Sequence, residues 1–167
     1  EAEHHYHQVL AIDPRNAASW FNLAKLHEKE GNLGVGLDCA AKAVEAQPNF
    51  VEAMETLGVL LHDHYRLDEC VHVLLQVLAI RPDSSVALSN IALSCRQMGR
   101  MEESMAYYGR LLLADLDNFY AHYNLALLLL ENGDLVNGWA ECEYRGRDLR
   151  ATNTKLRPRP QPRWEGS

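Results

Sequence analysis

Cysteine and histidine are the residues of this 167-residue chain whose side chains offer the most chemistry. The four cysteines, Cys39, Cys70, Cys95 and Cys142, are separated by 31, 25 and 47 residues. No C-x-x-C pair exists, so the motifs of zinc and redox sites are missing. Six of the eight histidines gather in two groups, without the i, i+4 spacing of a helical zinc site: His4, His5 and His7, and His62, His64 and His72. We expect structural thiols, solvated histidines and no metal site.

Catalytic motifs are also missing from the sequence. It has no glycine-rich phosphate loop after a strand, no G-x-S-x-G, and no nucleophile with a base at motif spacing. The neighbouring carboxylates of Glu102 and Glu103 fall in the predicted first turn of a helix, where the helix dipole favours negative charge. We therefore predict no catalytic residue and no cofactor, and this chain is not expected to be an enzyme.

A repeat of 34 residues organises the chain. Pro14, Pro48 and Pro82 mark its period. Six residues after each of these prolines, and again one period later, comes position i, which holds a large residue. An apolar residue follows at i+3, a small residue at i+4 and a fourth recurring residue at i+7. The four sets are Trp20, Leu23, Ala24 and His27; Met54, Leu57, Gly58 and Leu61; Leu88, Ile91, Ala92 and Cys95; and His122, Leu125, Ala126 and Leu129. This spacing places each set on one face of a helix, and the small residue lets a neighbouring helix approach.

The second half of each unit follows the same logic, with small residues at Gly36, Cys70, Ser104 and Gly138. The pattern predicts nine helices: 1–13, 17–30, 33–47, 51–64, 67–81, 85–98, 101–115, 119–132 and 135–146. Gly31, Gly99 and Gly133 stand where a helix ends in a left-handed residue. Tyr65 takes that place in the second unit, so a longer or strained turn is expected there.

This period and this order of large, small and proline positions resemble the tetratricopeptide repeat. The resemblance covers about residues 1–146 and implies an all-α fold, an α-solenoid of antiparallel helix hairpins wound into a right-handed superhelix. Residues 1–16 would be the second helix of a truncated leading repeat. Four repeats would follow, at 17–50, 51–84, 85–118 and 119–146 (or 152), before a basic, proline-rich tail at 147–167. Such modules bind peptides or proteins in a concave groove.

In this family the groove is lined by the first helix of each hairpin. One groove position holds Asn22, Thr56, Asn90 and Asn124, whose side chains resemble the asparagine ladder of O-linked N-acetylglucosamine transferase repeats. Amides both donate and accept hydrogen bonds, so they suit the backbone of an extended peptide. The alternative is that they bond neighbouring loops or water. The further groove residues are Phe21, Lys25, Tyr120 and Tyr123. Only Lys25 and Arg96 stand where chaperone-binding members hold a terminal carboxylate, so chaperone tails are disfavoured.

Charge limits the classes of partner. The net charge of −7 argues against a general nucleic-acid binder, whose phosphate contacts need a basic surface. Residues 145–167 hold seven basic and two acidic residues and so carry +5, which leaves −12 on residues 1–144. No apolar run approaches the length of a membrane helix, and the opening residues resemble the middle of a helix more than a signal peptide. The unpaired cysteines favour a reducing compartment, and we expect a cytoplasmic protein.

Two functions remain open. In the first, the chain is an interaction scaffold whose groove binds a peptide, with self-association through the basic tail, 155–163, as a second expectation. The alternative rests on 138–145, GWAECEYR, and 162–166, PRWEG, which resemble the junction of bacterial tetratricopeptide–glycosyltransferase proteins. That resemblance implies a substrate-recognition arm whose catalytic domain lies beyond Ser167.

Overall fold

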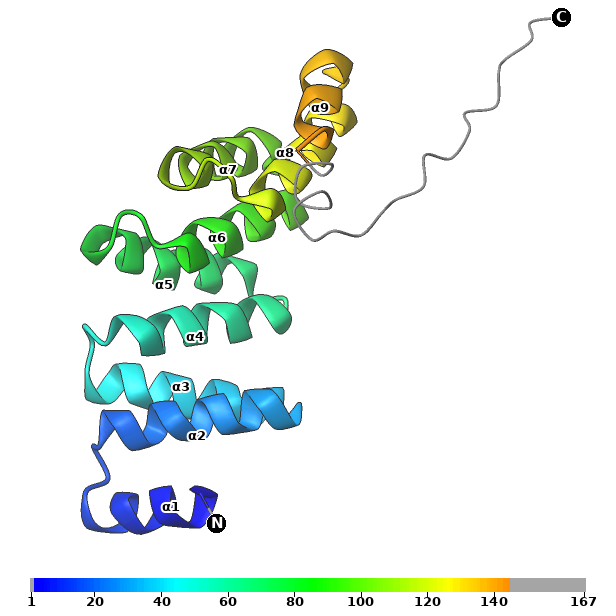
Figure 1. Ribbon diagram of the computed structural model, residues 1–167. Coiled ribbons are helices and arrows are strands. Elements are labelled where there is room, and N and C mark those ends of the chain that lie inside the picture. Colours follow the sequence, from blue (N-terminus) through cyan, green and yellow to red (C-terminus); the bar gives the residue numbers. More distant parts are fainter. Residues whose placement is uncertain (1, 145–167) are drawn as a thin grey trace, which may run out of the picture. The chain divides into compact units, whose positions relative to one another are not determined.

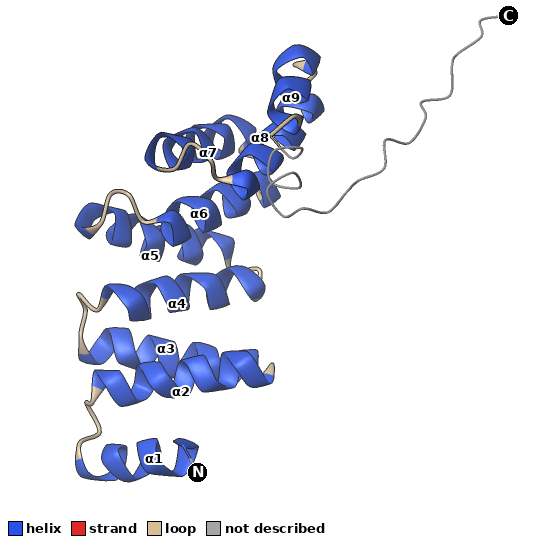
Figure 2. Cartoon of the chain, viewed as in Figure 1, coloured by secondary structure: helices blue, strands red, loops and turns tan. Residues whose placement is uncertain are grey.

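The computed structural model describes residues 2–144, and this part of the chain consists of nine α-helices and no strand (Figures 1 and 2). The helices are α1 (Ala2–Ile12), α2 (Ala17–Glu30), α3 (Leu33–Ala46), α4 (Val51–Asp63), α5 (Leu67–Ile80), α6 (Ser85–Gln97), α7 (Met101–Ala114), α8 (Phe119–Glu131) and α9 (Leu135–Cys142). The all-α prediction is confirmed, and from α2 to α8 each helix ends within one residue of its predicted end. No helix within 2–144 has the length and apolarity to cross a membrane.

The chain divides into two compact units, 1–116 and 117–167. In the first unit α2 packs on α3, α4 on α5 and α6 on α7, while α3 also contacts α4 and α5 also contacts α6. These helices therefore stack in chain order, each against its neighbours (Figure 1). In the second unit α8 packs against α9.

Side-chain caps explain where the first helix of most hairpins begins. The Oδ1 atom of Asn16 accepts a hydrogen bond from the Ser19 N–H at 2.9 Å, and Ser84 and Asn118 cap α6 and α8 in the same way. These caps are spaced by multiples of the 34-residue period. The N-cap residue of α4 is Phe50, whose side chain makes no capping hydrogen bond. Its ring lies against Phe21 instead, with 5.1 Å between ring centroids.

The turns inside the hairpins depend on left-handed residues. Gly31, Gly99 and Gly133 have φ of 78°, 76° and 81°, and Tyr65 has φ of 57°. At the first turn the Asn32 N–H donates to the His27 carbonyl at 2.8 Å, which satisfies a carbonyl at the helix end. The second turn therefore has the length of the others, and the strain expected there falls on Tyr65.

The predicted small positions form the tight contacts of the core. Gly58 on α4 faces Leu74 on α5, and a Cβ atom at Gly58 would lie 2.4 Å from Leu74 Cδ2. Ser104 on α7 is fully buried, and its hydroxyl donates to the Ala92 carbonyl of α6 at 2.7 Å. Ala24 and Ala126 are fully buried as well. A longer side chain at these positions would separate the paired helices.

Helix α9 is shorter than predicted, ending at Cys142 and not at 146. The Tyr144 N–H bonds the Glu141 carbonyl three residues back, as in a tightened last turn. The Tyr144 ring then stacks on His122 of α8, with 3.6 Å between centroids. Tyr144 thus contacts α8 after α9 has ended, and periodicity within α9 could not reveal that contact. The predictions for the basic tail and for 162–166 fall outside the described residues.

Candidate functional site

The proposed groove residues of the first unit lie on α2, α4 and α6, the first helices of the three hairpins. Helix α4 contacts both α2 and α6, so equivalent positions on the three helices are neighbours. Asn22 and Asn90 are half-buried, whereas Thr56 is buried, with 8% of its surface exposed. The line predicted from the sequence is therefore uneven: an amide on α2, a buried hydroxyl on α4 and an amide on α6.

The two amides are held differently. Asn90 Nδ2 donates to the Val86 carbonyl at 2.8 Å, one turn back on its own helix. That bond fixes the orientation of the side chain and uses one of its two N–H donors, so Oδ1 and a second N–H remain for other contacts. Asn22 shows no side-chain hydrogen bond in the described part of the chain. Both positions can therefore add hydrogen bonds to a partner.

Phe21 and Lys25 flank Asn22 on α2. The Phe21 ring is half-buried against Phe50, the N-cap residue of α4, so it links the first helix of one hairpin to the start of the next. The Lys25 ammonium lies 2.6 Å from Glu28 Oε2, and about half of the lysine side chain is exposed. This pair is an exposed i, i+3 ion pair, so it constrains the lysine only weakly.

A charged network borders the line on α4, and the sequence reasoning did not find it. Arg81, after α5, donates from Nη2 to Glu52 at 3.0 Å and lies 3.6 Å from Glu55. The Ser84 hydroxyl donates to Glu55 at 2.6 Å. The hydrogen bond from Arg81 lowers the pKa of Glu52 below its usual range. The sequence feature that could have predicted this network is the Glu-x-x-Glu of α4 together with an arginine 29 residues after the first glutamate.

The second unit holds Tyr120, Tyr123 and Asn124 on α8. The tyrosines are 47% and 39% exposed, and Tyr123 stacks with Phe119 at 6.3 Å between centroids. Asn124 is buried and donates from Nδ2 to the Tyr120 carbonyl at 2.8 Å. The exposed contacts of this helix are therefore aromatic, and Phe119, 36% exposed, belongs with them although the sequence reasoning missed it.

The histidines have partners within the protein. His62 Nδ1 lies 3.0 Å from the Ser94 hydroxyl, His64 Nδ1 lies 2.8 Å from the Leu60 carbonyl, and His72 Nε2 lies 3.1 Å from Gln76. Cys39, Cys70 and Cys95 are free and buried. Burial raises the pKa of all three thiols, which disfavours the reactive thiolate. Within 2–144, no three potential metal ligands come together.

A family model described as tetratricopeptide repeat matches residues 1–49 and 89–138, more than half of the chain. The chain belongs to the tetratricopeptide repeat family. No curated protein matches the sequence.

Solved structures share the fold of this tetratricopeptide repeat chain at low sequence identity. A crystal structure of MamA is 17% identical over 88% of this chain and 87% of its own, with a TM-score of 0.82. MamA from Desulfovibrio magneticus RS-1 is 13% identical over 91% and 85%, with a TM-score of 0.79. YrrB, described as a TPR protein with an unusual peptide-binding site, is 14% identical over 89% of this chain and 76% of its own, with a TM-score of 0.76.

Proposed function

We propose that this chain is a protein-interaction scaffold that binds an extended peptide along α2, α4 and α6. The observation that carries the proposal is the pair of half-buried amides on α2 and α6, the two first helices that contact α4. Asn90 is oriented by its bond to Val86 and keeps Oδ1 for a partner, while Asn22 keeps its whole amide. An amide pairs with peptide N–H and C=O groups whatever the peptide's sequence.

Thr56 contributes less to this proposal than the two asparagines, because its side chain is buried. Lys25 can add a charge contact by exchanging Glu28 for an acidic group of the peptide. Phe21 supports the surface by holding the repeats in register. In the second unit, Tyr120 and Tyr123 supply exposed aromatic area for a partner, and Asn124 orients the first turns of α8.

The test uses the double variant Asn22→Ala with Asn90→Ala. Twelve-residue peptides selected from a random library on the full chain would be titrated by calorimetry. At about 1 kcal/mol per net hydrogen bond, the double variant should bind roughly 30-fold more weakly. Asn124 is left unchanged because it is buried.

Asn49→Ala is the matched control, since Asn49 is an exposed asparagine in the turn between α3 and α4. It should bind the selected peptides as the unaltered chain does. Equal affinity of the double variant and the unaltered chain, with the same thermal midpoint, would remove the amides from the binding site.

The transferase alternative is not developed as a second function. Its second motif, at 162–166, lies outside the described residues, and its first, at 138–145, overlaps α9 only in part. Sequencing the parent gene beyond Ser167 tests it, since a strand-rich α/β region there would support a transferase.

A further inference from the structure

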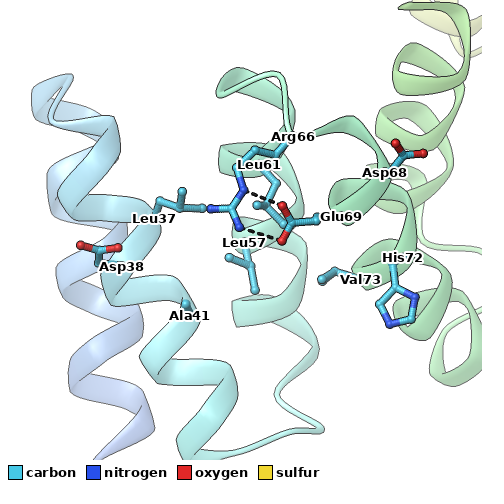
Figure 3. A pocket seen from close by; sticks show the side chains of 10 residues that line it. All are labelled: Leu37, Asp38, Ala41, Leu57, Leu61, Arg66, Asp68, Glu69, His72 and Val73. Carbon is cyan, nitrogen blue, oxygen red and sulfur yellow. Dashed lines mark hydrogen bonds and ion pairs between the residues drawn. The ribbon is translucent and has the colours of Figure 1, made fainter. Parts of the chain in front are cut away.

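A pocket of about 380 Å³ opens between α3, α4 and α5, on residues that the proposed peptide groove does not use. Its apolar lining comes from Leu37 and Ala41 on α3, Leu57 and Leu61 on α4, and Val73 on α5 (Figure 3). Asn22, Thr56 and Asn90 do not line it. A concave apolar space with charged groups at its edge is the usual form of a ligand site.

The 34-residue period explains why the pocket exists. One repeat further on, Ala41 is replaced by Leu75 and Val73 by Tyr107, both larger. Tyr107 is half-buried, and its pKa is raised first by burial and then by the neighbouring Cys95. Cys95 is the counterpart of Leu61, so Tyr107 lies beside the interval that corresponds to the pocket. The chain therefore shows which group fits such an interval: an aromatic ring.

A cation accompanies that ring in the filled interval. The Arg110 guanidinium lies 5.5 Å from the centre of the Tyr107 ring, within the range of a cation–π contact. The counterpart of Arg110 beside the pocket is Gln76. The pocket thus lacks both the ring and the cation that occupy the corresponding interval of the next repeat.

The edge of the pocket is acidic. Asp38, Asp68 and Glu69 surround it with a single arginine, Arg66. Glu69 accepts two hydrogen bonds from Arg66 at 2.7 Å each, drawn as dashed lines in Figure 3. Asp68 accepts one from Arg100 at 3.2 Å. Asp38 shows no ion pair in the described part of the chain, although Arg66 lies near enough to interact with it electrostatically. Its exposed carboxylate can therefore still pair with a cation from outside.

We propose that this pocket binds an aromatic side chain of a partner peptide, with a basic residue beside that aromatic residue pairing with Asp38. The ring would occupy the space over Leu57 and Leu61 that Tyr107 occupies one repeat on. The cation would replace, in trans, the contact that Arg110 makes to Tyr107. The site is a second binding point, on residues of α3, α4 and α5 that the amide line does not use.

The probe is the labelled heptapeptide Gly-Ser-Arg-Tyr-Arg-Ser-Gly, titrated into the full chain by fluorescence polarisation. Saturable binding is expected, and Val73→Tyr should weaken it at least tenfold because it restores the ring that fills the next interval. Ala41→Leu gives a second, smaller obstruction with the same expected effect. Both variants should keep the thermal midpoint of the unaltered chain, since they reproduce residues that the fold already accommodates one repeat on.

Two controls separate the ring from the charge. A heptapeptide with alanine in place of tyrosine should not bind. A heptapeptide with glutamines in place of both arginines should bind several-fold more weakly, and its binding should no longer depend on salt. The original peptide should show the same two changes when it is titrated into the Asp38→Asn variant.

The proposal is overturned if folded Val73→Tyr binds the probe as tightly as the unaltered chain, or if no saturable binding occurs. It is also overturned if the chain associates with itself and Val73→Tyr removes that association, because a second copy would then be the occupant. The variant of Asn22 and Asn90 should bind this probe normally. Failure of the amide groove and failure of the pocket are therefore separate results.

Discussion

At the scale of single residues, Tyr65 shows how the repeat resists a departure from its pattern. The first, third and fourth turns place glycine in the left-handed region, and the second turn holds Tyr65 there with φ of 57°. The Tyr65 N–H still bonds the His62 carbonyl at 2.9 Å, and the ring is 78% exposed. The side chain gains little from packing, so its Cβ strain is not offset locally.

Tyr65→Gly should therefore stabilise the protein. Relief of the left-handed strain should raise the free energy of unfolding by roughly 1–2 kcal/mol. The greater conformational freedom of glycine in the unfolded chain offsets part of this gain, which leaves a net stabilisation of about 0.5–1 kcal/mol. Urea unfolding measures the change. Tyr65→Ala is the control, because alanine keeps the Cβ atom and should bring no gain. Equal stability of the two variants would contradict the strain argument.

The buried thiols make a second prediction at this scale. Burial raises the pKa of Cys39, Cys70 and Cys95, so folding favours the protonated thiol. Their contribution to stability is present below the unfolded thiol pKa, about 8.5, and is lost as the pH rises through the higher folded value. The urea midpoint should fall between pH 8 and pH 10. A variant with alanine at all three positions should show a smaller fall over the same range; an identical fall would assign the effect to other groups.

At the scale of elements, glycine has opposite roles in α4 and α7. At Gly58 an added Cβ atom would lie 2.6 Å from Leu74 Cγ, and Leu74 is fully buried and cannot move aside freely. At Gly109 an added Cβ atom meets nothing within 4 Å. Packing therefore determines how a larger residue at Gly58 changes stability, whereas helix propensity determines it at Gly109.

Gly58→Ala should destabilise the protein by about 1–3 kcal/mol, the usual cost of overpacking a core. Gly109→Ala should stabilise it by up to about 1 kcal/mol, because alanine favours a helix and no contact opposes it. Thermal or urea unfolding of both variants gives the comparison. Stabilisation by Gly58→Ala would show that α4 and α5 separate at little cost.

At the scale of the whole molecule, each unit is held together by neighbouring helices. Helix α1 contacts α2, whereas α4 contacts α3, α5, α6 and α2. In a stack of this kind, stability is a sum of repeat terms and neighbour terms, so a change at one end acts mainly there.

Hydrogen exchange tests this arrangement. Leu10→Ala removes the buried side chain of α1 and should speed amide exchange in α1 and α2, with α4 and α5 unchanged. Leu74→Ala, a matched truncation in the middle of the first unit, should speed exchange from α4 through α6 and cost about 2–5 kcal/mol. Equal effects of the two variants across the unit would indicate one cooperative core and not a stack.

The sequence alone determined the architecture. Periodicity identifies the helices because burial selects one face of each, and the small residue at Gly58 and its equivalents identifies where paired helices meet. It also placed the left-handed residue of the three glycine turns, since that position is local to a few residues. For the turn at Tyr65 it left open a longer or a strained turn, and the structure decided between them.

Only the tertiary structure decided which exposed positions are open. Asn90 is oriented by its own helix, Thr56 is buried by its neighbours, and Phe21 lies against Phe50 at the start of α4. Beyond the end of α9, Tyr144 stacks on His122, and the pocket depends on the sizes of Ala41 and Val73. Apart from the bond of Asn90 to Val86, each of these is a contact between residues far apart along the chain. Periodicity records which face is buried, whereas the volumes that meet across an interface decide what space remains.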